Sequence, residues 1–258
     1  MIDLEINGTI LKEIDLIIFD KDGTLIELFP YWTVVARKRA ENICYAMHVS
    51  DDSLVEWISL LMGVDNRKKA MNPKGPIGIN NRPYIENLVF EELQKKGYPV
   101  DPQMIAAAFR ETDVYISQDK ILRQALVPVR GLVEFLSAIS PGCRCAIFSY
   151  DQTVNLEHSN RLMQIDGYFS RLLGGDQLLH PKPDPWGAVR IMDDLHISPA
   201  HTLLIGDSIH DIESGKKAGC RYLITRRSDI SDLAKLKPLS DFVIDDYTSI
   251  LPLNQESS

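Results

Sequence analysis

Short, uninterrupted apolar runs recur along the second half of the chain and occur once near its beginning. Residues 16–19 end directly at Asp20, residues 145–148 end at Ser149, and residues 203–205 are followed by Gly206-Asp207. Runs this short and this apolar are typical of strands covered on both faces, as in a parallel sheet. Two further runs of the same kind occupy residues 222–224 and 242–244.

Amphipathic helical patterns separate these apolar runs. Residues 129–139, 185–195 and 211–218 place apolar side chains three and four positions apart, and Gly219 follows the last of them. From about residue 127 onward, strand and helix patterns alternate. This order predicts an α/β fold: a Rossmann-like parallel sheet core with right-handed crossovers.

The stretch between the first apolar run and this alternating region has a different pattern. It is rich in helical periodicity and poor in strand candidates, with Pro, Gly and Asn punctuation near its middle. We therefore predict an inserted all-α domain at residues 26–126, and an α/β core made of residues 1–25 and 127–258. The expected helices of the insert cover residues 31–47, 52–62, 83–96 and 102–115.

Composition narrows the class of protein. The chain has 258 residues, of which 45% are hydrophobic and 25% charged, enough for a sizeable buried core. Its formal net charge of -8 argues against non-specific nucleic-acid binding. No leader-like or membrane-length apolar segment is present, so we expect a cytoplasmic protein without a membrane partner. Four scattered cysteines without a C-x-x-C pair favour reduced thiols.

Polar side chains follow three of the predicted strands at the point where each strand ends. These are Asp20, Ser149 and Asp207. Because ligands bind outside the carboxyl ends of strands in an open parallel sheet, we expect the three to converge. Asp22 would face the same way as Asp20, and two carboxylates in one site suit acid/base or metal chemistry. Taken alone, one or both of these carboxylates could instead cap a helix or turn.

Two more charged residues lie near helix starts. Lys182 stands between two prolines, which restrict its backbone and suit a fixed cation, although a single lysine is most often a solvated surface charge. Asp211 begins a predicted helix four residues after Asp207, where an acidic side chain is also a capping candidate. Neither residue is decisive by itself.

Taken together, these motifs resemble those of the haloacid dehalogenase superfamily. They occur in the family's order on the expected elements, and the helical insert resembles the type called a C1 cap. The chain is most similar in appearance to phosphoglycolate phosphatase-like members. Lys21 departs from the pattern, since an apolar residue is common there. The matching segments are Asp20-Lys21-Asp22-Gly23-Thr24, then Ser149, Lys182, Gly206-Asp207-Ser208, and Asp211.

The resemblance implies a Mg²⁺-dependent phosphatase acting on a small phosphorylated metabolite. Asp20 would be the nucleophile that becomes an aspartyl-phosphate, and Asp22 the general acid and base. Ser149 and Lys182 would bind the phosphoryl group. Mg²⁺ would lie among the Asp20 carboxylate, the Asp22 backbone carbonyl and the Asp207 carboxylate, and Asp211 would orient Lys182 or a metal-bound water.

Other readings of the same residues stay open. A phosphomutase of the β-phosphoglucomutase type shares the first half-reaction and returns the phosphoryl group to its substrate. A haloacid dehalogenase would not need Asp22 and Asp207, and a phosphonate-cleaving enzyme would need a desolvated lysine. A catalytically inactive binding relative is the alternative from a different class. The substrate and the oligomeric state do not follow from the sequence.

Overall fold

The computed structural model describes residues 1–78 and 80–253. The chain divides into two compact units. The first consists of Met1–Glu27 and Pro128–Ser258, and the second of Leu28–Val127.

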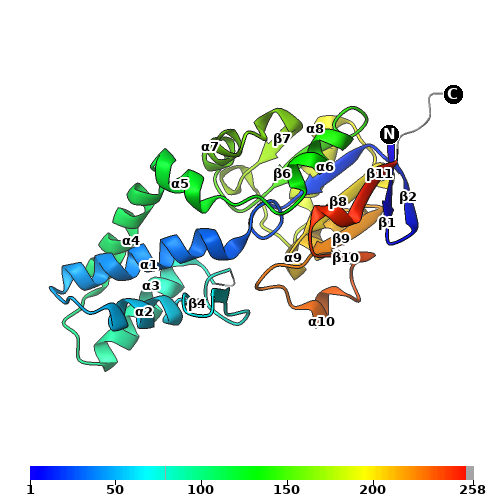
Figure 1. Ribbon diagram of the computed structural model, residues 1–258. Coiled ribbons are helices and arrows are strands. Elements are labelled where there is room, and N and C mark those ends of the chain that lie inside the picture. The colour runs from blue at the N-terminus through cyan, green and yellow to red at the C-terminus, as the bar shows by residue number, and fades with distance from the viewer. Residues whose placement is uncertain (79, 254–258) are drawn as a thin grey trace. The chain divides into compact units, whose positions relative to one another are not determined.

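The first unit is built on a six-stranded parallel sheet, drawn in Figure 1. Its strand order, β10-β9-β8-β3-β6-β7, puts β3 between β8 and β6. The parallel α/β class predicted from the apolar runs is confirmed, while β7 was not predicted. The strands are β3 (Leu16–Phe19), β6 (Arg144–Phe148), β7 (Phe169–Leu173), β8 (Thr202–Gly206), β9 (Tyr222–Arg226) and β10 (Phe242–Ile244).

Both faces of this sheet are covered, which explains the continuous apolar runs. In β3, Ile17 and Phe19 belong to one buried cluster, and Leu16 and Ile18 belong to the other. This is the alternation expected of a strand whose two faces are both buried. The crossover segments contain α6 (Leu132–Ile139), α7 (Thr153–Met163), α8 (Trp186–Leu195), α9 (Ile209–Lys217), α10 (Leu233–Leu236), and the short 3₁₀ turns Asp166–Tyr168, Gly175–Gln177 and Pro199–His201. A fourth 3₁₀ turn, Tyr247–Ser249, connects β10 to β11.

A second, antiparallel sheet of three strands was not predicted. Strand β1 (Ile2–Ile6) lies between β2 (Thr9–Ile14) and β11 (Ile250–Leu253). The tight turn from β1 to β2 uses Asn7 and Gly8, both with positive φ, as the favoured hairpin turns require. In β1, the buried Leu4 and Ile6 alternate with the polar Asp3 and Glu5, so this strand forms no continuous apolar run.

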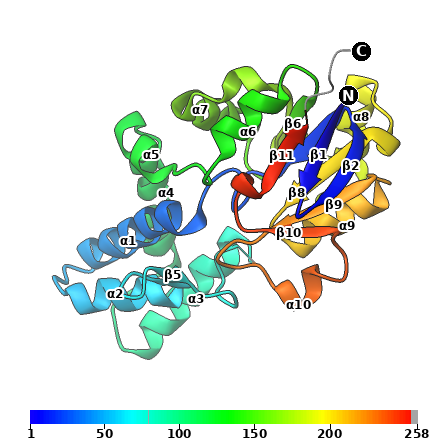
Figure 2. The same ribbon diagram turned by 45° about the vertical axis from the view of Figure 1, so that its right-hand side comes forward.

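The second unit is mainly helical. Helix α1 lies alongside α2 and α4, as Figure 2 shows. Asp101 caps α4 by accepting from the backbone N–H groups of Gln103 and Met104, a common way to satisfy the first turn. A short antiparallel hairpin and a fifth helix were not predicted. The elements are α1 (Leu28–Ala46), α2 (Asp52–Leu61), β4 (Val64–Asp65), β5 (Ala70–Met71), α3 (Arg82–Lys95), α4 (Pro102–Ile116) and α5 (Asp119–Ala125).

Among the residues described, none of the helices combines the length and the apolar character that a membrane span would need.

Candidate active site

The carboxyl ends of three adjacent strands bring the expected side chains to one edge of the sheet. Asp20 follows β3, Ser149 follows β6 and Asp207 follows β8. The backbone N–H of Asp20 donates to the carbonyl oxygen of Ile205 at 2.9 Å, which continues the parallel ladder to the end of the strand. Because β8, β3 and β6 are neighbours in the sheet, the three side chains that follow them lie close together, as expected from the sequence.

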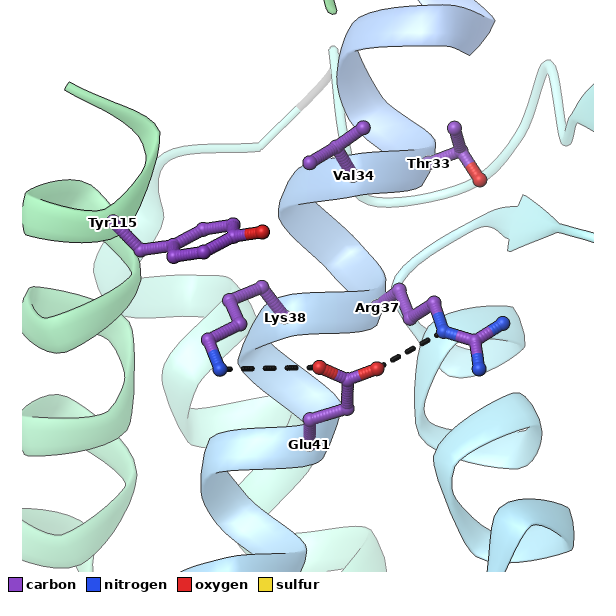
Figure 3. A pocket seen from close by; sticks show the side chains of 6 residues that line it. All are labelled: Thr33, Val34, Arg37, Lys38, Glu41 and Tyr115. Carbon is purple, nitrogen blue, oxygen red and sulfur yellow. Dashed lines mark hydrogen bonds and ion pairs between the residues drawn. The ribbon is translucent and has the colours of Figure 1, made fainter. Parts of the chain in front are cut away.

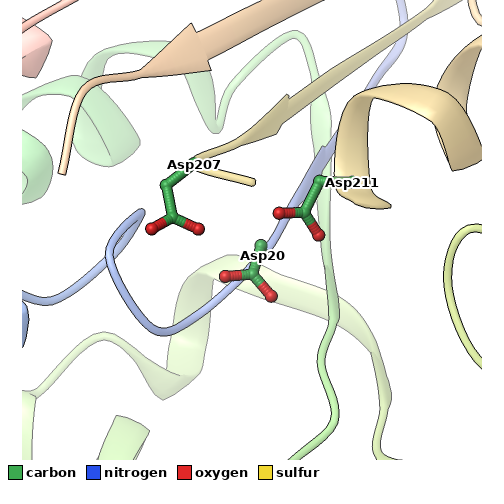
Figure 4. Close-up of side chains that lie close together, drawn as sticks. All are labelled: Asp20, Asp207 and Asp211. Atoms are coloured by element: carbon green, nitrogen blue, oxygen red, sulfur yellow. The ribbon is translucent and has the colours of Figure 1, made fainter. Parts of the chain in front are cut away.

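Three carboxylates crowd together at this edge. Asp20, Asp207 and Asp211 each have an oxygen within 4.8 Å of an oxygen of both others, and Figure 4 shows the three groups facing one another. Asp207 and Asp211 are almost completely buried, and the Asp20 side chain is 11% exposed. Like charges held this closely in a poorly solvated place need a compensating cation.

Lys182 supplies part of that compensation from the loop before α8. Its Nζ donates to Asp20 Oδ1 at 2.7 Å, to Asp211 Oδ1 at 2.6 Å and to the carbonyl oxygen of Phe148 at 2.6 Å. All three ammonium protons thus have acceptors. Burial disfavours the charged form of Lys182, but the two carboxylates outweigh it, and the pKa of Lys182 lies above its usual value. The lysine is a fixed cation.

One ammonium does not neutralise three carboxylates, and the pKa values of the acids reflect this. Burial raises the pKa of Asp20 to about 7, and repulsion from Asp211 and Asp22 adds to the effect against the attraction of Lys182. Burial and the charges of Asp20 and Asp211 also raise the pKa of Asp207 well above its usual value. Without a further cation, the site therefore holds protons that ordinary aspartates would release.

A divalent cation fits this site on charge and on ligand type. Ionised Asp20, Asp207 and Asp211 together with Lys182 leave a formal charge of about −2, and hard dications prefer carboxylate oxygens. The two Asp211 oxygens are already engaged, Oδ1 with Lys182 and Oδ2 with the backbone N–H and the hydroxyl of Ser208. Asp20 and Asp207 are therefore the side chains available to a metal ion. The Asp22 side chain is outside the cluster; our metal prediction for Asp22 concerned its backbone carbonyl.

Asp211 combines a capping role with an electrostatic one. Its Oδ2 accepts from the Ser208 backbone N–H, and the Ser208 side chain accepts from the Asp211 backbone N–H, which makes a capping box at the start of α9. Its other oxygen holds Lys182. The sequence offered capping and orientation of Lys182 as separate readings, and both apply to the same side chain.

The turn that carries Asp22 approaches Asp207 very closely. Gly23 adopts a φ of +81°, and a β-carbon at this position would lie 2.1 Å from Asp207 Oδ2. Only glycine avoids both the strained backbone and the collision. Asp22 Oδ1 is buried and accepts no hydrogen bond in the described part of the chain. Burial raises the pKa of Asp22, although nearby Lys21 acts in the opposite direction.

Ser149 is 2% exposed, and its hydroxyl donates no hydrogen bond within the described residues 1–78 and 80–253. Its backbone N–H donates to Leu173 O, and its Oγ accepts from the backbone N–H of Asp151 at 3.1 Å. That bond uses an oxygen lone pair and leaves the hydroxyl hydrogen free to rotate. The Tyr150 hydroxyl donates to the carbonyl oxygen of Lys182 at 2.6 Å, which links the Ser149 loop to the lysine loop.

Sequence reasoning missed the hydroxyl groups that hold Asp207. Ser228 Oγ donates to Asp207 Oδ2 at 2.6 Å, and Ser231 Oγ donates to the Asp207 carbonyl oxygen at 2.7 Å. Both serines follow β9, which is the neighbour of β8 in the sheet. In the sequence, the two serines are marked only by their position after a predicted strand. They could not be assigned to Asp207 until the strand order placed β9 beside β8.

Arg226, at the end of β9, holds the turn after Asp22. Its Nη1 donates to the carbonyl oxygen of Gly23 at 3.1 Å, and its Nη2 donates to Glu27 Oε1 at 2.6 Å. Arg226 is 4% exposed, whereas the Glu27 side chain is 33% exposed, so the ion pair is only partly shielded from water. Arg226 therefore anchors the chain that follows Asp22.

The helical unit has basic side chains of its own around a shallow pocket of about 280 Å³, shown in Figure 3. Glu41 lies between Arg37 and Lys38 and makes ion pairs with both. Lys38 Nζ also lies 5.0 Å from the centre of the Tyr115 ring. Arg37 and Lys38 thus both have a carboxylate partner within the helical unit.

The geometry fits a known class of hydrolase, and comparison with known proteins identifies it. A sequence profile of haloacid dehalogenase-like hydrolases matches residues 14–219. The chain belongs to this family. The recognition made from the ordered motifs is confirmed.

Relatives of this haloacid dehalogenase-like hydrolase include named phosphatases. A phosphoglycolate phosphatase of Psychrobacter arcticus is 35% identical over 104 residues, covering 36% of this chain and 45% of the relative. A phosphoglycolate phosphatase of Vibrio cholerae is 24% identical over 248 residues, covering 93% and 97%. In the relatives with 33 to 35% identity, the match covers only 40 to 45% of their length.

The fold of this haloacid dehalogenase-like hydrolase is also found among solved structures. A predicted phosphoglycolate phosphatase from Haemophilus somnus superposes with a TM-score of 0.64 at 20% identity, covering 92% of this chain and 96% of the other. At this identity the likeness establishes the shared fold.

Proposed function

We propose that this hydrolase is a Mg²⁺-dependent phosphatase that cleaves a small phosphorylated metabolite, of the phosphoglycolate type, through an aspartyl-phosphate on Asp20. The observation that carries the proposal is the pairing of Asp20 with a buried, fully engaged lysine beside a second buried carboxylate. An anionic nucleophile must meet an anionic phosphate, and this cluster contains the groups that reduce their repulsion.

In the first half-reaction, Asp20 attacks phosphorus while the bond to the leaving oxygen breaks. Lys182 lies against Asp20 Oδ1 and fixes the rotation of that carboxylate. Lys182 and the free hydroxyl hydrogen of Ser149 would bind the phosphoryl oxygens as charge shifts onto them. Asp211 holds Lys182 in place from the other side.

Asp22 is the proposed general acid and base. Its raised pKa favours the protonated form that can give a proton to the leaving oxygen. In the second half-reaction a water attacks the aspartyl-phosphate, and the Asp22 carboxylate takes a proton from it. An alcohol and inorganic phosphate are the products.

Mg²⁺ would be held by the Asp20 and Asp207 carboxylates with the Asp22 backbone carbonyl. When bound, it would neutralise phosphate charge and align the phosphoryl group with the nucleophile. Ser228 would keep the Asp207 carboxylate turned toward it through the 2.6 Å hydrogen bond. Ligand-orienting hydrogen bonds of this kind are part of most metal sites.

The helical unit is proposed to be the cap that excludes water and selects the substrate. It is inserted between Asp20 and Ser149 in the sequence, at the point where the family resemblance places such a cap.

Purified protein assayed for release of inorganic phosphate tests the proposal. We expect hydrolysis of phosphoglycolate or a chemically similar monoester with Mg²⁺, and loss of activity with EDTA. Asp20→Asn should lose at least ~10⁴-fold of kcat and all transfer of labelled phosphate to the protein. Activity retained in that variant would exclude Asp20 as nucleophile. Isomerised sugar phosphate without phosphate release would favour a mutase, and no turnover of any monoester would favour an inactive relative.

A further inference from the structure

Lys21 is a buried cation at the position where the resemblance leads one to expect an apolar side chain. Its side chain is only 5% exposed, and its Nζ lies 2.5 Å from Asp151 Oδ2 and 3.4 Å from Asp22 Oδ1. Lysine is rarely buried unless it is paired, because its ammonium is strongly hydrated. Both of these carboxylates therefore help to compensate the burial of the Lys21 ammonium.

Asp151 fixes the direction of this ammonium. Asp151 Oδ1 accepts from the backbone N–H of Gln152 and from Asn155 Nδ2, both at 2.8 Å, so its other oxygen is turned to Lys21. The Asp151 backbone N–H donates to Ser149 Oγ at 3.1 Å. The Lys21–Asp151 pair thus joins the turn that carries Asp22 to the loop that carries Ser149.

The two buried lysines of the site serve different carboxylates. Lys182 has its three protons engaged by Asp20, Asp211 and Phe148 O. Lys21 is the cation in ion-pair distance of Asp22, whose Oδ1 is buried without a hydrogen bond among the described residues. The nucleophile and the acid therefore have separate cations.

We propose that Lys21 is a positioning residue for Asp22: anchored by Asp151, it orients the Asp22 carboxyl group and stabilises the carboxylate left when Asp22 gives up its proton. In that step the bond between Asp20 and phosphorus forms, and the bond between phosphorus and the leaving oxygen breaks. The proton moves from Asp22 to that oxygen, giving an alcohol and an ionised Asp22. The inference rests on the proposed function, because it requires Asp22 to act as the acid.

The dependence of the rate on the leaving group separates this role from a structural one. An alkyl phosphate needs a proton on its leaving oxygen, whereas 4-nitrophenyl phosphate releases a stable anion that does not. kcat/KM is the quantity to compare, because it reports the first half-reaction even when hydrolysis of the aspartyl-phosphate limits kcat. General acid catalysis is typically worth 10²–10⁴-fold, so the difference between the two substrates should be measurable.

Lys21→Met keeps the length of the side chain and removes its charge. We expect it to lower kcat/KM for the alkyl phosphate by roughly 30- to 100-fold and for 4-nitrophenyl phosphate by less than about 3-fold. Asp151→Asn, which releases the anchor without altering Lys21, should shift the two substrates in the same unequal way. Lys21→Arg should recover part of the alkyl phosphate activity. Lys235→Met, at an exposed lysine paired with Asp232, should change neither.

Asp22→Asn in the same assay separates the inference from the proposed function. If Asp22→Asn shows the leaving-group dependence and Lys21→Met lowers both substrates equally, Lys21 has only a structural role and the inference is overturned. If Asp22→Asn also affects both substrates equally, the acid assignment itself is wrong and the inference falls with it. If Lys21→Met does not fold, Lys21→Gln and Asp151→Asn test the positioning role instead. The quantity compared is again the loss of kcat/KM for the alkyl phosphate relative to the loss for 4-nitrophenyl phosphate.

Discussion

Gly23 and Asp207, far apart in the sequence, lie in such close contact that a methyl group on Gly23 would overlap the Asp207 carboxylate at 2.1 Å. The turn after Asp20 therefore packs directly against the Asp207 carboxylate, and there is no room for a side chain at position 23. Gly23 also has a left-handed backbone, with a φ of +81°. The glycine meets two requirements at once, one conformational and one steric.

Gly23→Ala should consequently damage the site more than the fold. The left-handed backbone alone costs about 1–2 kcal/mol for a non-glycine residue. The collision should in addition displace Asp207 and weaken Mg²⁺ binding by roughly tenfold or more, measured by calorimetric titration alongside the melting temperature.

Gly8→Ala is the matched control for this prediction. Gly8 has a φ of +79°, and a β-carbon there would meet nothing within 4 Å. The control should reproduce the backbone penalty without any change in Mg²⁺ affinity. Equal Mg²⁺ affinity in Gly23→Ala and wild type would show that Asp207 tolerates displacement or is not a ligand.

Removing the hydroxyl that holds Asp207 tests the same ligand from the other side. Ser228→Ala deletes the donor to Asp207 Oδ2. Loss of such an orienting bond typically weakens metal binding by about 10- to 100-fold. Mg²⁺ titration of Ser228→Ala should show a weaker Kd, whereas Ser240→Ala, which removes a hydroxyl bonded to Thr225 Oγ1, should leave the Kd unchanged.

Asp211→Asn should lower activity through Lys182. The substitution leaves one oxygen that can still cap α9 through Ser208, but it turns an N–H₂ group toward the Lys182 ammonium. We expect kcat to fall by roughly 10²-fold or more and the free energy of unfolding to fall by about 1–3 kcal/mol. Kinetics and urea denaturation measure the two effects.

Asp51→Asn provides the comparison for Asp211→Asn. Asp51 caps α2 in the helical unit by accepting from the Ser53 backbone N–H, a bond that asparagine can also accept. This variant should retain wild-type kcat. A normal kcat in Asp211→Asn would instead mean that Lys182 needs no support from the α9 side.

The stabilising effect of Mg²⁺ should grow with pH. The pKa of Asp20 is raised from 3.8 to about 7 in the folded chain, so the fold binds this proton more tightly than the unfolded chain does. That contribution to stability is fully present below about pH 4 and is lost as the pH rises toward 7. Mg²⁺ binds the ionised carboxylates, so it replaces the lost proton.

Melting temperatures with and without Mg²⁺, taken between about pH 5 and about pH 8, measure this linkage. The increase in melting temperature caused by Mg²⁺ should be small at the acid end of this range and large at the alkaline end. Asp20→Asn should reduce the dependence on pH, because its amide does not titrate and the raised pKa of Asp207 leaves the remainder. A gain that is independent of pH in the wild-type protein would contradict a site built on buried aspartates.

The pattern of hydrophobic residues predicted those strands and helices whose burial is visible within a short segment of the sequence. Strands such as β3 and β8 are buried on both faces, so their residues are apolar without interruption, and the side chain that follows each strand is marked by its polarity. The β1–β2 hairpin was missed although its Asn7-Gly8 turn is a local signal, and β11 pairs with β1 from more than 200 residues away. Local patterns carry no information about such pairing.

The sequence by itself determined the class of the fold and the residues with polar chemistry at strand ends, because burial and side-chain period follow from the order of apolar and polar positions. Only the tertiary structure showed that Ser228 donates to Asp207 and that Lys21 pairs with Asp151, whereas the contact of Asp211 with Lys182 was expected from the family resemblance. The two unexpected contacts each join different loops at the carboxyl ends of the strands. The distance between these loops depends on strand order, which no single segment of sequence contains.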